Sequence, residues 1–330
     1  MANLTQSSTH SGSAVPLIAA AGLLAGIGAA LAWAAYSRRR IPHQLPLTAA
    51  LDAELNYVNT PSAGRIGYYV AGPQTRSRAP LLLVHSVNAA ASAFEMRPLF
   101  ERLARDRRVY ALDLPGFGFS NRTDHDYTPG LMRDMLLDFM RLVLKNVPAD
   151  VAALSLSCEF VALAAATQPD AFRTLTLISP TGMSPRARQV RANEGLLRAL
   201  RAPSWSRPIF DLLTSRPSLR LFTGQSARRI MPHEFTDYAY TTSHQPDAEL
   251  APFAFVAGKL FTPDIFETYE SLHQPTLLIY GRDPFAQYDF VDQLVSRKNW
   301  RIMPLPRAGA LAHWDFPELV TMKIEEHTAA

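Results

Sequence analysis

The feature that most restricts the fold is a regular alternation of short apolar runs with helical stretches. Strand patterns are expected at 64–72, 79–86, 107–116, 150–155 and 175–180, with helices between them at about 95–105, 129–146 and 158–168. After a mostly helical break at 184–274, strands are expected at 275–281 and 299–305, followed by a last helix from about Trp314. Strands that alternate with helices in this way form a parallel sheet with right-handed crossovers. We therefore predict one α/β domain with a large helical insertion.

A second feature is the segment from Val15 to Tyr36, which runs for twenty-two residues without a charge. A helix needs roughly 20 apolar residues to cross a bilayer. A cleaved signal peptide would have a positively charged region before a shorter apolar core, and residues 1–14 contain no Lys or Arg. We therefore predict a single-pass membrane anchor. Residues 38–40 are all arginine, and the positive-inside tendency then places the C-terminal domain in the cytoplasm.

These features divide the chain into segments. We expect an N-terminal tail (1–14), a transmembrane anchor (15–36), a juxtamembrane linker (37–55), an α/β core (56–183 and 275–330) and a helical cap (184–274).

Composition narrows the classes of partner. The net charge of +4 is only mildly basic, and no basic stripe interleaved with aromatic residues accompanies it, so no nucleic acid is predicted. The single cysteine, Cys158, excludes an intrachain disulfide and a multi-cysteine metal site. No metal or other cofactor is predicted, and the sequence indicates no oligomeric state.

The chemistry is expected just after the strands, because open parallel sheets bind ligands at the carboxyl ends of their strands. The segments there are "HSVNAAAS" (85–92), "DLPGFGFS" (113–120), "SLSCEF" (155–160) and "RDPF" (282–285). The segment "DLPGFGFS" is similar to the D-x-P-G-x-G-x-S turn of the α/β-hydrolase family, and the resemblance covers roughly residues 56–330. It implies a mostly parallel sheet with a helical cap, and a serine, an acid and a histidine in that chain order.

The resemblance also implies a role for single residues. Ser155 is implied as the nucleophile, Asp283 as the acid, and the N–H of Leu156 with one near Ser86 or Val87 as oxyanion donors. Asp289 is the fallback acid, because "GRDP" is one residue shorter than the family's usual G-x-x-D.

The family's G-x-S-x-G turn lacks its glycines in this chain. Ala153 and Ser157 stand at the two glycine positions, and both are small, which is the steric requirement of a tight strand-to-helix turn. If Ser157 were the nucleophile, the bulky Glu159 would take a flanking position, so Ser155 is preferred. Ser155 could alternatively end a strand and cap the following helix without any chemistry.

The histidine is displaced. The family has Gly-His after its last strand, whereas this chain has Gly309-Ala310, and His313 follows three residues later. A simple overlay then leaves the serine without a base. If the loop is three residues longer, His313 reaches the serine; otherwise it is a surface or helix-capping residue.

Three functions follow from this pattern. The first is a membrane-anchored serine esterase or lipase-like acyl hydrolase that uses Ser155, His313 and Asp283 on a small apolar ester or lipid-like substrate. The second is a catalytically silent module of the same fold that binds an apolar ligand or a partner, which Ala310 favours. The third is a carbon–carbon bond hydrolase that uses the same serine.

Overall fold

A computed structural model describes residues 14–74 and 78–329, without the side chains of residues 14–25, 27 and 188. The chain divides into two compact units, Met1–Pro42 and His43–Ala330. The first contains the helix α1 (Ala14–Arg40). Among the residues described with their side chains, no helix is long and apolar enough to cross a membrane. Residues 15–25 and 27 of the predicted anchor lie outside that description, so the anchor stays a sequence prediction.

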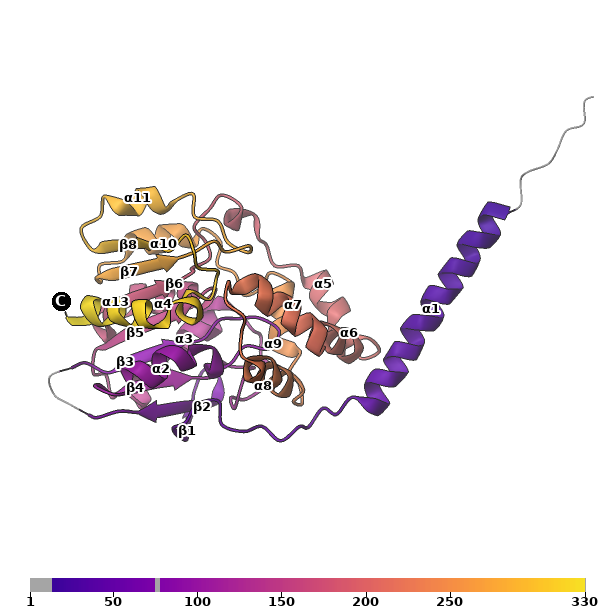
Figure 1. The fold of residues 1–330 in the computed structure, drawn as a ribbon, viewed down its shortest axis with the longest axis horizontal. Helices are drawn as coiled ribbons and strands as arrows, with labels where there is room; N and C mark the ends of the chain where they lie inside the picture. Colours follow the sequence, from indigo (N-terminus) through magenta and orange to yellow (C-terminus); the bar gives the residue numbers. More distant parts are fainter. Residues whose placement is uncertain (1–13, 75–77, 330) are drawn as a thin grey trace, which may run out of the picture. The chain divides into compact units, whose positions relative to one another are not determined.

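The second unit is built on one eight-stranded sheet with the order β1-β2-β4-β3-β5-β6-β7-β8 (Figure 1). The strands are β1 (Glu54–Thr60), β2 (Gly64–Ala71), β3 (Leu81–Val84), β4 (Val109–Leu112), β5 (Ala149–Leu154), β6 (Phe172–Ile178), β7 (Thr276–Tyr280) and β8 (Trp300–Pro304). The pairs β1–β2 and β2–β4 are antiparallel, and the strands β3 to β8 run parallel to one another. The predicted mostly parallel sheet is confirmed, and β1 is an additional strand that the sequence did not indicate.

Helices cover both faces of the sheet. They are α2 (Arg97–Leu103), α3 (Pro129–Leu142), α4 (Ser157–Thr167), α10 (Ile265–Ser271), α11 (Val291–Val295), α12 (Ala312–Asp315) and α13 (Pro317–Ala329), with the 3-10 turns η1 (Ala93–Met96) and η2 (Pro169–Ala171). Alternate residues of β3 point to opposite faces, so Leu82 packs with α3 and α4 while Leu81 and Leu83 pack with α2 and α13. The strand is therefore buried on both sides, as its continuous apolar run predicts.

The insertion between β6 and α10 is helical, as the break in the pattern predicted. It contains η3 (Ala187–Gln189), α5 (Glu194–Leu200), α6 (Ser206–Leu213), α7 (Arg216–Ser226), α8 (His233–Ser243) and α9 (Leu250–Val256). A small apolar cluster of its own includes Leu197, Phe210 and Phe253. In Figure 1, α6 to α9 gather at one end of the sheet.

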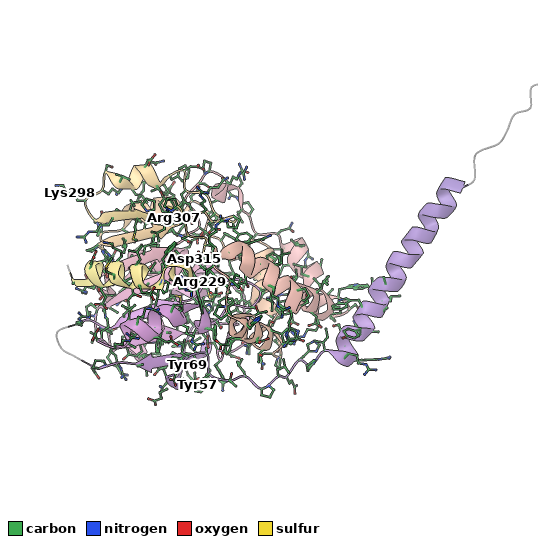
Figure 2. The ribbon with its side chains drawn as sticks, viewed as in Figure 1. Tyr57, Tyr69, Arg229, Lys298, Arg307 and Asp315 are labelled. Atoms are coloured by element: carbon green, nitrogen blue, oxygen red, sulfur yellow. The ribbon has the colours of Figure 1, made fainter. Side chains whose placement is uncertain are left out.

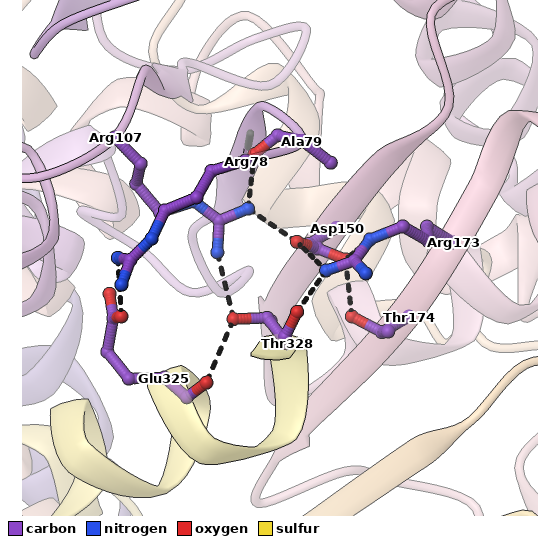
Figure 3. A network of polar contacts seen from close by, with 8 residues as sticks. All are labelled: Arg78, Ala79, Arg107, Asp150, Arg173, Thr174, Glu325 and Thr328. Atoms are coloured by element: carbon purple, nitrogen blue, oxygen red, sulfur yellow. Dashed lines mark hydrogen bonds and ion pairs between the residues drawn. The ribbon is translucent and has the colours of Figure 1, made fainter. Parts of the chain in front are cut away.

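The opposite end of the sheet holds a buried charge network (Figure 3). Asp150, in β5, accepts hydrogen bonds from Arg107, from Arg173 (Nε to Oδ1, 2.8 Å) and from Thr174 (2.7 Å). Arg107 also donates to Thr328 Oγ1 in α13 at 2.9 Å, so the network fixes the last helix to the sheet. The side chains of Asp150 and Arg107 are almost completely buried.

Candidate active site

A cavity of about 380 Å³ lies where the parallel strands end. Its lining includes Ser86 after β3, Ser155 after β5, Asp283 after β7 and Ala310 after β8. The other walls are apolar and come mainly from α6 to α9, including Phe210, Leu213, Leu219, Phe222, Phe235 and Phe253. Residues from four separate strand ends therefore meet at one apolar cavity, at the position where open parallel sheets bind ligands.

Ser155 lies in the sharp turn between β5 and α4. Its φ of +56° is in the left-handed region, which costs a residue with a side chain on the order of 1 kcal/mol. The turn is held from both sides: the N–H of Ser155 donates to the carbonyl of Ile178 at 2.8 Å, and its own carbonyl accepts from the N–H of Cys158 at 3.1 Å. The surrounding chain thus maintains a strained backbone that presents the Ser155 side chain to the cavity.

The two residues at the glycine positions are accommodated. Ala153 is fully buried in β5. Ser157 is also fully buried, and its hydroxyl donates to the carbonyl of His85 at 2.5 Å, which fastens the start of α4 to the end of β3. Ser157 does not line the cavity. The structure therefore gives Ser155 the exposed position of the turn and Ser157 a packing role.

The N–H groups implied as oxyanion donors differ in whether they are already hydrogen-bonded within the protein. The N–H of Ser86 donates to Glu95 Oε2 at 2.9 Å, so it is already used within the protein. Within the described residues, the N–H groups of Val87 and Leu156 donate to no protein acceptor. Val87 lines the cavity and Leu156 directly follows Ser155. The N–H of Ser86 is therefore already bonded, and the role of Val87 and Leu156 as oxyanion donors stays a prediction.

Glu95 is a cavity residue that no sequence motif indicated. It is 5% exposed, and its carboxylate accepts from the N–H of Ser86 and from Asn88 Nδ2 at 2.7 Å. Burial raises the pKa of Glu95, and the bonds from Ser86 and Asn88 oppose this rise. The sequence signal was weak, because a single acid in the stretch "ASAFEM" is typical of an exposed helix position.

The segment "DLPGFGFS" has a structural role. The carboxylate of Asp113 accepts from the N–H of Ala93 at 2.8 Å and of Phe119 at 2.9 Å, which joins the end of β4 to η1. Gly118 has a φ of +48°, and a Cβ there would lie 2.0 Å from the Asp113 carboxyl carbon. The glycine is therefore required by the close packing of the turn around Asp113.

Asp283 lies in the cavity wall after β7, whereas Asp289 is exposed and is not part of the lining. Oδ1 of Asp283 accepts from the N–H of Phe285 at 2.7 Å. Burial raises the pKa of Asp283, and this backbone donor opposes the rise. The described residues contain no ion pair to Asp283. Of the two acids considered from the sequence, the structure brings Asp283 to the cavity that Ser155 lines.

The loop that carries Ala310 is held tightly. The N–H of Gly309 donates to Asp315 Oδ2 at 2.7 Å, and the N–H of Leu311 donates to the carbonyl of Ser226 at 3.0 Å. Asp315 Oδ1 also accepts from the N–H of Arg228 (2.9 Å) and of Arg229 (2.8 Å), and Figure 2 shows Asp315 beside Arg229. These bonds connect the loop both to Asp315 and to the inserted helices.

His313 is not brought to the cavity. It lies in α12, its ring is fully buried, and Nε2 donates to the backbone carbonyl of Glu95 at 2.8 Å. Burial lowers the pKa of His313 to about 4. The sequence expectation that this ring reaches Ser155 is corrected: His313 is absent from the cavity lining, and its Nε2 is bonded to the Glu95 carbonyl.

No nitrogen base is found among the described residues that line the cavity, which include no His, Lys or Arg. His85 directly precedes the cavity residue Ser86, but its Nε2 accepts from the N–H of Leu114 at 2.9 Å. Burial lowers the pKa of His85 to about 4, so the ring is neutral and serves the fold. Within the described part of the chain, no group of three His, Cys, Asp or Glu could hold a metal ion.

Comparison with known proteins was made by sequence and by structure. The profile of the alpha/beta hydrolase family matches residues 81–321. A search of curated protein sequences gives no match.

Several solved structures share the fold at low sequence identity. A serine hydrolase involved in carbazole degradation is 19% identical, with a TM-score of 0.66 over 83% of this chain and 98% of that chain. A thermophilic esterase from Thermogutta terrifontis is 22% identical, with a TM-score of 0.63 over 83% and 97%. A bacterial membrane phospholipase A is 19% identical, with a TM-score of 0.60 over 95% and 96%. Because the family profile covers most of the chain and the sheet carries a helical insertion above its strand ends, this chain belongs to the alpha/beta hydrolase family.

Proposed function

We propose that this protein binds an apolar carbonyl compound, such as an ester or a lipid-like acyl group, in the cavity beside Ser155. The N–H groups of Leu156 and Val87 are the proposed donors to the carbonyl oxygen, and the apolar side chains of α6 to α9 contact the chain of the ligand. The protein does not use the imidazole of His313. The observation that carries this proposal is that Ala310, and not a histidine, lines the cavity with Ser155 and Asp283.

The missing base limits the chemistry. In a Ser-His-Asp enzyme, the imidazole takes the hydroxyl proton as the oxygen attacks the carbonyl and returns it to the leaving group. General bases contribute typically 10²–10⁴-fold to such steps. A ligand with an unactivated ester is therefore bound and turned over slowly. Carbon–carbon bond hydrolysis needs the same proton transfer from Ser155 and is limited in the same way.

Ester hydrolysis with Asp283 as the proton acceptor is the second candidate. It is favoured because Asp283 lines the same cavity and burial raises its pKa towards neutrality. A carboxylate with a pKa nearer to the working pH is a stronger base.

The test combines a binding and a turnover measurement. An environment-sensitive naphthyl ketone should bind saturably with a blue-shifted emission, and Phe253→Asp, which puts a charge in the cavity wall, should weaken binding at least tenfold. The protein should hydrolyse p-nitrophenyl octanoate near the uncatalysed rate. Enzymes typically have a kcat on the order of 10 s⁻¹. A kcat of this size that disappears in Ser155→Ala would overturn the proposal that esters are turned over only slowly. Absence of ketone binding would overturn the proposed ligand class.

For residues 15–36 we propose a membrane anchor with the hydrolase domain on the cytoplasmic side. Support comes from the sequence: twenty-two residues without a charge followed by Arg38, Arg39 and Arg40. The test is alkaline carbonate extraction of membranes from expressing cells. Release of the full chain into the supernatant would contradict the anchor, and a protease-protection assay checks the side.

A further inference from the structure

The described lining of the cavity carries the kinds of group that an acyl-transfer site uses, except a nitrogen base. Ser155 contributes a hydroxyl on a strained turn, Val87 and Leu156 contribute two N–H groups, and Asp283 contributes a carboxylate. The described lining residues include no histidine, lysine or arginine.

The ionisable side chains that line the cavity are all acidic among the described residues. Asp283 and Glu95 are its ionisable lining residues among those described. Glu95 is held by Ser86 and Asn88. Asp283 is held by uncharged donors, the N–H groups of Phe285 and Ala286 and the hydroxyl of Tyr288, and has no ion pair in the described chain. A carboxylate in an apolar wall without a counter-charge favours a ligand that brings a basic group.

The loop at Ala310 forms the part of the cavity wall where such a group would lie. Ala310 lines the cavity, and both of its neighbours are hydrogen-bonded, Gly309 to Asp315 and Leu311 to Ser226. The carbonyl of Ala310 is held as well, by the hydroxyl of Ser179 at 2.7 Å. The backbone at Ala310 is therefore held in place, and a methyl group is the only side chain that residue 310 contributes to the cavity wall.

We propose that the ligand supplies the missing base: the substrate is an apolar ester that carries a basic nitrogen, which occupies the volume beside Ala310 between Ser155 and Asp283. This inference rests on the proposed binding of apolar carbonyl compounds. The nitrogen lone pair takes the proton of the Ser155 hydroxyl while Oγ bonds to the ester carbonyl carbon, and the oxyanion is held by Val87 and Leu156. The protonated nitrogen of the substrate, paired with the carboxylate of Asp283, returns the proton to the leaving alkoxide. The alcohol that carries the base then leaves. In the slower second step, water attacks the acyl carbon and gives its proton to Asp283, which returns it to Ser155 Oγ as the carboxylic acid departs.

The test is a matched pair of esters. The ester 2-(imidazol-4-yl)ethyl octanoate carries the base, and 2-phenylethyl octanoate replaces the imidazole with a ring of similar size. At pH 7.5, where imidazole is mostly neutral, release of octanoate with the purified full-length protein is compared with the rate without protein. The imidazole ester should show a burst of acyl-enzyme on Ser155 and an enzyme-dependent rate at least tenfold above that of the phenyl ester.

Substitutions test which residues are responsible for the faster turnover of the imidazole ester. Ser155→Ala should remove the enzyme-dependent rate. Ala310→Leu, which fills the volume, should lower it at least tenfold for the imidazole ester, and Asp283→Asn should lower it by a similar factor. Asp289→Asn is the matched control for Asp283→Asn, because Asp289 is exposed and outside the lining, and should leave the rate unchanged.

Free 4-methylimidazole gives an independent measurement. It should accelerate acylation of Ser155 by 2-phenylethyl octanoate, with saturation, and Ala310→Leu should abolish the saturation. Equal turnover of both esters would assign the proton to Asp283 and overturn the inference. Turnover of neither ester, together with normal binding of the naphthyl ketone, would overturn this inference alone, whereas loss of ketone binding would overturn the proposed function beneath it.

Discussion

The backbone carbonyl of Glu95 accepts two hydrogen bonds, from His313 Nε2 at 2.8 Å and from Trp314 Nε1 at 2.7 Å. Two neighbouring side chains of α12 thus hold the turn η1, which carries Glu95 to the cavity. The ring that the sequence indicated as a base serves as a structural donor, and its Nδ1 is buried without a partner in the described chain.

The first prediction restores the base. Ala310→His should accelerate labelling of Ser155 by a fluorophosphonate at least 100-fold, because an imidazole beside Ser155 and Asp283 supplies general-base catalysis worth 10²–10⁴-fold. Labelling is measured by intact-protein mass spectrometry over time. Ala310→Asn, which adds a polar group without a usable base, is the control. Equal rates for the two variants would show that residue 310 does not face the Ser155 hydroxyl.

The second prediction concerns acid. His85 and His313 both have a pKa lowered to about 4 by burial, against 6.5 for an ordinary histidine. Between pH 4 and 6.5 the unfolded chain binds more protons at these sites, so stability rises with pH across this window and falls on acidification. Each histidine contributes a slope of up to about 1.4 kcal/mol per pH unit.

His313→Gln isolates one of these contributions. Glutamine retains an N–H donor for the Glu95 carbonyl, so the variant should fold, and its stability should depend on pH less steeply by up to one proton. Urea unfolding at pH 5.0, 6.0 and 7.0 measures the difference. The buried acids, including Glu159 with its pKa raised to about 7, contribute equally to both proteins and cancel. Parallel curves for the two proteins would contradict the assignment.

The third prediction tests strain at the turn. Ser155→Gly should raise the free energy of unfolding by up to about 1 kcal/mol, because glycine adopts a φ of +56° without the steric cost that serine bears. Ser157→Gly should lower it by about 1 kcal/mol, since it removes the hydrogen bond to the His85 carbonyl and weakens the start of α4. Thermal unfolding of the pair is the measurement, and shifts of the same sign would contradict the strain.

The fourth prediction concerns the network in Figure 3. Asp150→Asn should destabilise the protein by about 3–5 kcal/mol, because Arg107 would stay buried without its counter-charge. Glu326→Gln removes the exposed pair with Lys323 and should cost at most about 1 kcal/mol. Urea unfolding compares the two. A similar small cost for both variants would mean that Arg107 reaches solvent when Asp150 loses its charge.

Much of the α/β core could be predicted, because each buried strand is marked by an apolar run within a few consecutive residues. The continuous apolar runs of β3 and β5 indicate strands buried on both faces, and the polar residues after them indicate a site at the strand ends. Ser155 was preferred over Ser157 on side-chain size alone, and the buried hydroxyl of Ser157 agrees with that choice.

The remainder depends on contacts between distant residues. The loop at Ala310 is bonded to Asp315 and to Ser226 of the inserted helices, and no spacing within 304–317 reveals the contact with Ser226. Glu95 reaches the cavity because Ser86 and Asn88 bind its carboxylate, which is equally invisible in a linear pattern. The sequence therefore predicted which strand ends meet at the cavity, but not the buried position of His313 outside its lining.

Asp315 joins two parts of the protein through one carboxylate, with Gly309 on one side and Arg228 and Arg229 on the other. The segment that follows α7 and the turn that carries Ala310 are therefore tied to the same side chain. Residues of α7 and Ala310 also line the same cavity. We therefore expect a substitution that shifts the end of α7 to change the position of residue 310 relative to Ser155 as well.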